Sequence, residues 1–493
     1  MFATLAALVP RDGDLPERAW KLDVLRRVLQ GTIYDKLTSA FHEERNGAGE
    51  YIPLRARRPS TRWNLCRIAT MDSVALLFGE GRFPVVYDDD PDARNHLADV
   101  VADSNLPAVM IDASTRGSIG SVAVRFRVLN GRVFFDAFDT LYLTPKWRTD
   151  APDTLAAVTE RYKIKGADLF ASGYAIPADM MTADYWFQRT WDDQWETWFA
   201  PLALADAKNG TVFAKDAKRS VRHRLGFCPW VWIRNLPGGD DIDGLCTFRQ
   251  GVDTQIELEY LLSQSGRGLK YSADPLLMLK EPAQSDGQLM VRSASNALVI
   301  SEGGDAKMLE ISGSAASAVI EHARVLRHSI MEVIGGSRGD PDKMTAAQSG
   351  RAMELLHQPL IWLADKLRGS YGGAVLSLAR MMVAASQRYP LRTRDQHIGR
   401  IAPVSLSLRW PPWFDPTATD DVAQMTQLTG LVAAGVISLE TATALVAREC
   451  GIANIGVERE RIQAERTGTK PVTTPAVRLV TQATEQEPDE PDN

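Results

Sequence analysis

The chain has 493 residues, and at roughly 100 to 200 residues per domain this length predicts about three domains. Hydrophobic residues make up 45% and charged residues 24% of the sequence, a globular balance that excludes a disordered chain and a membrane protein. Lys and Arg number 56 against 62 Asp and Glu, and the formal net charge of −6 argues against a protein that coats nucleic acid.

Cysteine usage and the N-terminus predict a soluble, cytosolic product that does not associate with membranes. The four cysteines form no CxxC pair, so neither a zinc ribbon nor a disulfide framework is indicated. Residues 1–10 carry no basic leader, and no apolar run reaches the roughly 18 residues that a membrane span needs.

The first 237 residues combine helical and strand patterns. Apolar residues from Leu22 to Leu37, including Ile33, recur at spacings of three and four and predict an amphipathic helix. A second helix is predicted over residues 64–81, ending at Gly79 and Gly81. Alternating residues between 121 and 144, with an Asn-Gly turn, predict a β meander. The segment is therefore α+β.

A strand pair is predicted over residues 158–164 and 185–198, and a further strand at 229–236 precedes a boundary near 237. Four tryptophans crowd the second of these segments. Aromatic residues at strand spacing favour a core or subunit contact, with base stacking as a minor hypothesis. They are Trp186, Trp191, Trp195 and Trp198.

Residues 242–334 read as a helix, a small insert and a second helix. The first helix is predicted over 242–262, broken by Gly266 and Gly268, the β-like insert over 271–311, and the second helix over 315–334. The second helix has a stripe that we expect to be buried and another that we expect to face water or a polar lumen. The buried stripe is Val319, Ala323, Leu326, Ile330 and Val333, and the polar stripe is Glu321, Arg324, His328 and Glu332.

The last third begins with a glycine-rich loop at 335–343. A long helix is predicted from about Thr345 to Tyr389, with kinks expected at Pro359 and at Gly372-Gly373, followed by a strand at 401–410. A helical hairpin follows, with a stop at Gly435, and from residue 467 the composition predicts a disordered tail.

No catalytic or metal-binding motif is evident. The sequence lacks a phosphate-binding GxxxxGK[ST] loop, an HExxH helix and a GxSxG elbow. His42-Glu43-Glu44 lacks a second histidine, and His322 and His328 are six residues apart rather than four. We predict no catalytic residue, no metal and no cofactor.

Several stretches, in this order, resemble tailed-bacteriophage portal proteins, the head-tail connectors of phage particles. They are residues 64–81 with the ending LLFGEG, 250–261 after NLPGG, 349–353 (SGRAM) leading into Asp365-Lys366, and the Asp420-Asp421 helix followed by GVISLETA at 435–442. Each is degenerate alone, and the match rests on their order across nearly the whole chain. The resemblance implies an α+β portal-type fold with an α/β wing, a two-helix stem, a small α/β clip, a long kinked wing helix and a helical crown, and it implies ring formation.

The resemblance divides the chain into named parts. It implies a wing over 1–238, stem helices over 239–268 and 313–335, a clip over 269–312, a tunnel loop over 336–350, the wing's long helix and strand over 351–415, and a crown over 416–466. The tail at 467–493 is predicted to be disordered.

As a portal, the chain would form a homo-oligomeric ring of twelve subunits at one capsid vertex of the virion, after assembly in the host cytoplasm. Double-stranded DNA would pass through the channel without sequence-specific contact. The implied protein partners are the major capsid protein, the terminase and a head-completion or tail adaptor protein.

Three sets of residues are predicted to carry this role. The glycine-rich loop would project into the channel, the polar stripe would line the stem lumen, and the clip would contact terminase or adaptor. The loop candidates are Ser337, Arg338, Asp340, Asp342 and Lys343; the lumen candidates are Glu321, Arg324, His328 and Glu332; the clip candidates are Asp274, Lys280, Glu281 and Asp286.

Two other readings stay open. Another capsid or head-completion structural protein would also lack an active site, but would not explain the order of helix, insert, helix, loop and long helix. A soluble DNA-processing enzyme would need acidic metal ligands in a cleft, and no such set stands out in the sequence.

Overall fold

A computed structural model describes residues 2–273, 276–282, 300–309, 313–336, 355, 357–413, 418–449 and 461–463. The chain forms two compact units, Met1–Phe414 and Asp415–Asn493. The first unit combines helices with mainly antiparallel sheets, so the α+β class is confirmed. Among the described helices, none is both long and apolar enough to cross a bilayer.

The N-terminal part contains three helices, α1 (Phe2–Ala6), α2 (Glu17–Gln30) and α3 (Leu65–Phe78). Helix α2 ends at Gly31, whose φ of 74° is left-handed, so Ile33 and Leu37 follow the helix and do not extend its stripe as predicted. Helix α3 matches its prediction. The side chain of Asn64 caps it by accepting the N–H of Arg67, and Gly79 follows its last residue.

Short elements lie between α2 and α3 and directly after α3. They are the paired strands β1 (Ser39–Ala40) and β2 (Arg57–Arg58), the 3-10 turn η1 (Leu54–Ala56) and strand β3 (Val85–Tyr87).

A three-stranded antiparallel sheet with the order β12-β4-β5 carries the main core. Its strands are β4 (Ser121–Leu129), β5 (Arg132–Asp139) and β12 (Trp230–Arg234). The predicted turn between β4 and β5 is present, with positive φ at Asn130 and Gly131. The meander prediction is wrong beyond it, because η2 (Thr140–Tyr142) redirects the chain into a second sheet and β12 takes the place beside β4.

Helices cover this sheet. Helix α5 (Leu106–Gly117) packs on β4 and β5, and α11 (Gln358–Ser386) packs on β12 and β4. Helix α4 (Pro91–Asp103) packs on α5, and the sequence patterns predicted neither α4 nor α5. The contact between α5 and α11 depends on Gly117, where an added Cβ would lie 2.2 Å from the Tyr371 hydroxyl oxygen.

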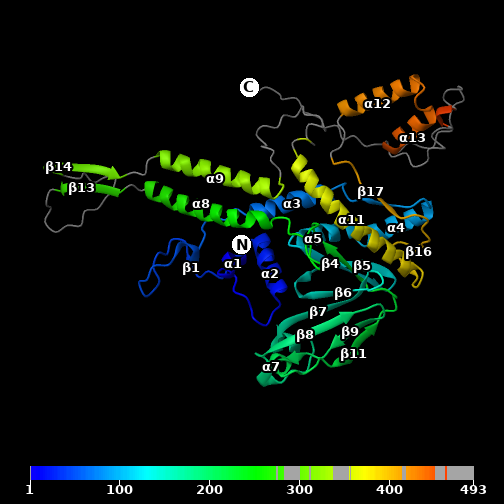
Figure 1. Ribbon diagram of the computed structural model, residues 1–493, viewed down its shortest axis with the longest axis horizontal. Helices are drawn as coiled ribbons and strands as arrows, with labels where there is room; N and C mark the ends of the chain where they lie inside the picture. Colours follow the sequence, from blue (N-terminus) through cyan, green and yellow to red (C-terminus); the bar gives the residue numbers. More distant parts are fainter. Residues whose placement is uncertain are drawn as a thin grey trace, which may run out of the picture. The chain divides into compact units, whose positions relative to one another are not determined.

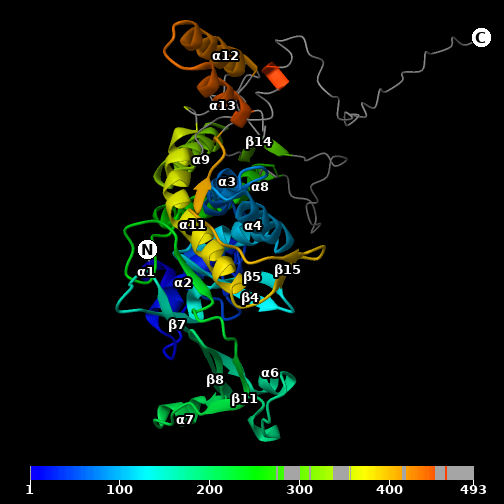
Figure 2. The same ribbon diagram turned by 90° about the vertical axis from the view of Figure 1, so that its right-hand side faces the viewer.

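The second sheet has six strands in the order β11-β9-β8-β7-β6, with β10 paired to β8. Figure 2 shows β7, β8 and β11 of this sheet. Trp186 and Trp191 are buried in it, which confirms a core role for these two tryptophans, whereas Trp195 is 36% exposed. The strands are β6 (Leu143–Trp147), β7 (Leu155–Lys165), β8 (Asp184–Trp191), β9 (Trp195–Phe199), β10 (Leu202–Ala203) and β11 (Lys215–Arg222), with short helices α6 (Gly166–Ala171), η3 (Ala178–Met180) and α7 (Leu204–Lys208) between them.

The helix, insert, helix prediction is confirmed in outline. Helices α8 (Val252–Ala273) and α9 (Gly313–Val333) lie side by side, and the antiparallel strands β13 (Leu276–Pro282) and β14 (Ile300–Leu309) lie beyond their ends (Figure 1). Helix α8 begins ten residues later than predicted, after the 3-10 turn η4 (Arg249–Gly251), and it continues through Gly266 and Gly268.

The long helix is α11, which begins at Gln358 in the described part of the chain. Pro359 stands in its first turn, where the missing N–H has no intrahelical partner to lose, so it starts the helix rather than kinking it. Gly372 and Gly373 do not interrupt the helix, and an added Cβ at Gly372 would lie 3.2 Å from Trp410 Cζ2. Short strands follow: β15 (Leu391–Arg392) pairs with β16 (His397–Ile398), and β17 (Ser407–Arg409), shorter than predicted, pairs with β3.

The second unit contains the predicted helical hairpin, α12 (Ala418–Ala433) and α13 (Leu439–Glu449). Gly435 has a φ of 70° and follows the end of α12, and the Ser438 hydroxyl accepts the N–H of Thr441 at the start of α13. The predicted tail at 467–493 lies outside the described residues.

Candidate functional site

The polar stripe of α9 lies where the sequence predicts it. Glu321, Arg324, His328 and Glu332 are spaced by three and four residues, about one helical turn, and all four are exposed. Arg324 and Glu321 form an ion pair of 3.4 Å with both side chains more than two-thirds exposed. Such a pair contributes little stability, so the stripe presents mixed charge to its surroundings rather than a fixed network.

The opposite face of α9 packs against the N-terminal part and α8. Ala323 and Ile330 are buried as predicted, but Val333 is 51% exposed. Met331 and Ile334 are buried instead. The chain turns at Gly335, which has a φ of 68°, and Gly336 then lies against Met331: an added Cβ at Gly336 would be 2.6 Å from Met331 Cε. Val319 and Leu326 are half-buried.

Apolar side chains remain exposed on the flanks of the helix pair. On α9, Ile320 is 51% and Val325 is 52% exposed, and on α8 Leu269 is 49% exposed. These three positions are candidate contact points for another protein.

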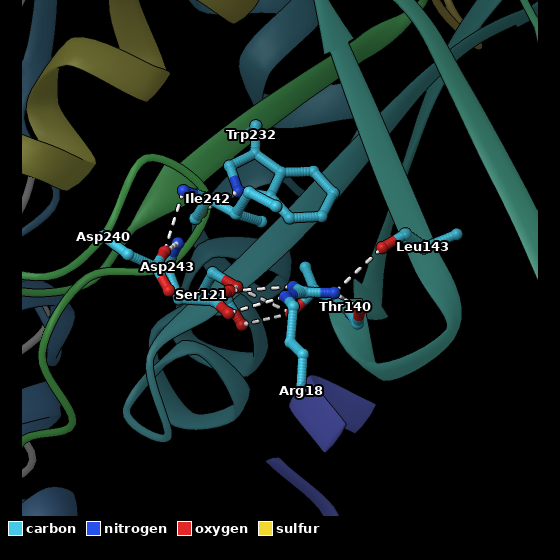
Figure 3. A network of polar contacts seen from close by, with 8 residues as sticks. All are labelled: Arg18, Ser121, Thr140, Leu143, Trp232, Asp240, Ile242 and Asp243. Carbon is cyan, nitrogen blue, oxygen red and sulfur yellow. Dashed lines mark hydrogen bonds and ion pairs between the residues drawn. The ribbon is translucent and has the colours of Figure 1, made fainter. Parts of the chain in front are cut away.

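The chain enters α8 through a buried polar junction, which sequence reasoning missed (Figure 3). The Arg18 guanidinium, from α2, donates to both carboxylate oxygens of Asp243 at 2.6 and 2.8 Å. It also donates to the carbonyl oxygens of Thr140 and Leu143 at 2.9 and 3.0 Å. Asp243 in addition accepts the Ser121 hydroxyl. The Asp243 side chain thus joins the segment before α8 to α2, through Arg18, and to strand β4, through Ser121.

The segment around Asp243 is held by further contacts. Trp232 lies over the Arg18 guanidinium and its indole N–H donates to the Ile242 carbonyl at 2.7 Å, while Asp240 accepts the Ile242 N–H at 2.8 Å (Figure 3). An added Cβ at Gly244 would lie 2.6 Å from the Asn235 nitrogen. These contacts fix residues 240–248 in a non-helical conformation. The predicted helix therefore does not begin at 242.

A second polar set lies on α8 itself. Gln255, Glu259 and Ser263 are buried although their side chains are polar. Burial raises the pKa of Glu259, while hydrogen bonds from Tyr34 and from the Trp63 N–H oppose that rise. The spacing of four residues between these polar side chains was the only signal in the sequence that could have marked a common face.

Most of the other predicted site residues lie outside the described part. This holds for the loop candidates Ser337, Arg338, Asp340, Asp342 and Lys343, and for the clip candidates Asp274 and Asp286. Lys280 and Glu281 lie on β13, and in the strand register Lys280 is opposite Asp305 of β14.

Thiols and groups of possible metal ligands are the other candidates for chemistry among the described residues. The thiols of Cys66, Cys228 and Cys246 are free, and burial raises the pKa of Cys228 and of Cys246 to about 12. Within the described ranges, no group of three or more His, Cys, Asp or Glu side chains could hold a metal ion.

Comparison with known proteins gives matches among solved structures but none by sequence. No protein-family model matches the sequence, and no curated protein matches it. Among solved structures, the chain is similar to a chain of the virion of a native gene transfer agent particle, with a TM-score of 0.38 and 11% identity, over 78% of this chain and 88% of that chain.

Proposed function

We propose that this chain is the subunit of a viral portal, a ring-shaped channel for double-stranded DNA at one capsid vertex. The observation that carries the proposal is the α8–hairpin–α9 arrangement, with an exposed stripe of mixed charge on the side of α9 opposite its packed face. The order of sequence signatures around it supports the same role, which is structural rather than catalytic.

The dimensions of the helix pair suit a channel wall. Helix α9 has 21 residues, and at 1.5 Å per residue its length is about 30 Å. Copies arranged about a rotation axis would place the stripe around a common lumen. The carboxylates of Glu321 and Glu332, on either side of Arg324 and His328 along the stripe, would keep the wall from holding phosphates, because strong phosphate contacts would retain DNA instead of letting it slide.

The proposal assigns partners to other parts of the chain. The ring would comprise twelve copies, contact the major capsid protein, and bind terminase and then an adaptor through the clip. Lys280 and Glu281, on β13, are the described members of the clip set. DNA would be contacted without sequence preference.

The glycine-rich loop at 336–350 is proposed to touch DNA through Arg338 and Lys343. The residues that flank the loop support this proposal, because they lie close together, as they would at the base of a projecting loop. An added Cβ at Gly335, before the loop, would lie 3.7 Å from the carbonyl oxygen of Pro359, after it. The double variant Arg338→Ala and Lys343→Ala should alter the length or retention of packaged DNA, with Arg148→Ala, at an exposed arginine outside the loop, as the control. Unchanged packaging would remove the two cations from the mechanism.

Imaging the purified full-length chain tests the ring. Negative-stain electron microscopy, with light scattering for the mass, should reveal closed rings with a central hole. A chain that stays monomeric across protein and salt concentrations, also in the presence of capsid protein, would contradict the proposal.

A further inference from the structure

Three backbone N–H groups of the segment 61–66 donate to three side chains of α8. The Thr61 N–H donates to Ser263 Oγ at 3.0 Å, and the Trp63 N–H donates to Glu259 Oε1 at 3.1 Å. The Cys66 N–H donates to Gln255 Oε1 at 2.9 Å. The segment therefore runs antiparallel to α8, and we call these three hydrogen bonds the α8 ladder.

The spacing of the ladder follows from backbone geometry. Residues four apart on a helix share one face and are separated by about 6 Å along its axis. Two residues of extended chain also cover about 6.6 Å. The two-residue separation of Trp63 and Thr61 therefore matches the four-residue separation of Glu259 and Ser263 along α8. The acceptors are 4%, 2% and 1% exposed for Gln255, Glu259 and Ser263, so water cannot replace a lost bond without opening the packing.

Both sides of the ladder are held in turn. The Tyr34 hydroxyl donates to Glu259 Oε2 at 2.6 Å, and the Ser263 hydroxyl donates to the Glu259 carbonyl at 2.7 Å. On the other side, the Asn64 amide donates to the Val28 carbonyl at the end of α2 at 2.7 Å. The segment is thus fixed to α2 before it meets α8.

We propose that the α8 ladder sets the axial position and the rotation of α8, and through the packing of α8 on α9 the direction of the polar stripe. Gln255, Glu259 and Ser263 are positioning residues in this account, which rests on the proposed channel function. A slip of one residue would move α8 by about 1.5 Å and turn it by about 100°, so all three bonds would be lost together. Apolar packing also opposes such a slip, but side chains without directional bonds can repack, so it fixes the axial position less sharply than three hydrogen bonds do.

Hydrogen exchange and a distance measurement on the full-length chain test this inference. Glu259→Met removes the acceptor, whereas Glu259→Gln keeps an oxygen for the Trp63 N–H and is the matched control. We expect the amide of Trp63 to exchange at least about tenfold faster in Glu259→Met, within about twofold of the parent in Glu259→Gln, and the β4 amides to stay unchanged. Spin labels at the exposed positions Ala318 and Asp150 should show a broadened distance distribution in Glu259→Met alone.

Either of two results would overturn the inference. One is an unprotected Trp63 amide in the parent chain, and the other is a Glu259→Met chain with lowered stability but an unchanged label distance, which is what a merely structural role predicts. A parent chain that forms no rings would contradict the channel proposal, while the exchange result would still decide whether the ladder fixes α8.

Discussion

A single guanidinium, that of Arg18, serves as donor to three separate parts of the fold. Its side chain is 23% and that of Asp243 is 12% exposed. Removing one member of such a pair leaves the other charge with little water, and this costs far more than the loss of a surface pair. The junction should therefore be among the most sensitive points of the first unit.

Replacing Arg18 with Met should lower the free energy of unfolding by about 3 kcal/mol, because Asp243 and two carbonyl oxygens lose their donor. Urea unfolding followed by tryptophan fluorescence measures the change. The control is Arg148→Met, since Arg148 and Asp150 are 52% and 66% exposed, and its cost should be much smaller than that of Arg18→Met. Equal costs for the two variants would show that the junction is not a stabilising pair.

Glu259 should give the chain a pH-dependent stability. Burial raises its pKa in the folded state, so the folded chain holds the proton to a higher pH than the unfolded chain does. The stability linked to this proton is complete below the unfolded value of about 4.3 and is lost as the pH rises through the raised pKa. Glu259→Gln removes this titration. The parent should therefore lose stability relative to the variant between pH 4 and pH 8, as measured by urea unfolding, and a constant difference would contradict the assignment.

The sequence does not reveal these residue-scale features because they depend on distant partners. Arg18 and Asp243 are 225 positions apart, as are Tyr34 and Glu259, and no local pattern marks either pair. The exposed stripe of α9 was predictable, since it depends only on helical periodicity and on one packed face.

At the scale of elements, the sequence predicted helix boundaries best where a local capping residue is present. Asn64, Gly79, Gly435 and Ser438 are local capping signals, and the elements they bound are where the sequence predicts them. The start of α8 was wrong because residues 240–248 are pinned by Arg18 and Trp232, a tertiary effect. Helices α4 and α5 went unpredicted, although Asp90 and Pro91 form a standard start: the Asp90 side chain accepts the N–H groups of Asp92 and Ala93.

The flank of α9 should be a contact between copies if the ring proposal holds. Ile320 lies beside the polar stripe and is 51% exposed, so Ile320→Lys should leave the fold intact but place a charge in the contact. We expect at least about a tenfold loss of rings in negative-stain images and in size-exclusion chromatography. The control is Val212→Lys, at a position that is 84% exposed near β11, and it should form rings as the parent does. Equal ring formation by both variants would exclude this flank from the contact.

At the scale of the whole molecule, the two compact units predict separable folding. All but one of the buried apolar residues of the described chain come from positions up to Ile401, and that one, Ala442, lies in the second unit. A chain ending at Phe414 should therefore keep the melting temperature of the first unit within about 3 °C, as measured by calorimetry. Aggregation of this truncated chain, or a fall of more than about 8 °C, would show that the second unit supports the first.

The net charge of the chain also has a different effect when many copies assemble. Each chain has a formal charge of −6, so twelve copies would carry −72, and a ring of them would repel DNA overall. The acidic balance first argued against a protein that coats nucleic acid. It is compatible with a proposed passage in which DNA moves without adhering.

The close approach of α5 and α11 at Gly117 has a consequence for evolution. Any side chain at 117 would collide with the Tyr371 hydroxyl and with Val122, whose Cγ1 would lie 2.9 Å from the added Cβ. The Tyr371 hydroxyl in turn donates to Asn235. Diverged homologues should therefore either keep glycine at 117 or change positions 117 and 371 together, and this paired signature could identify remote relatives when overall identity has faded.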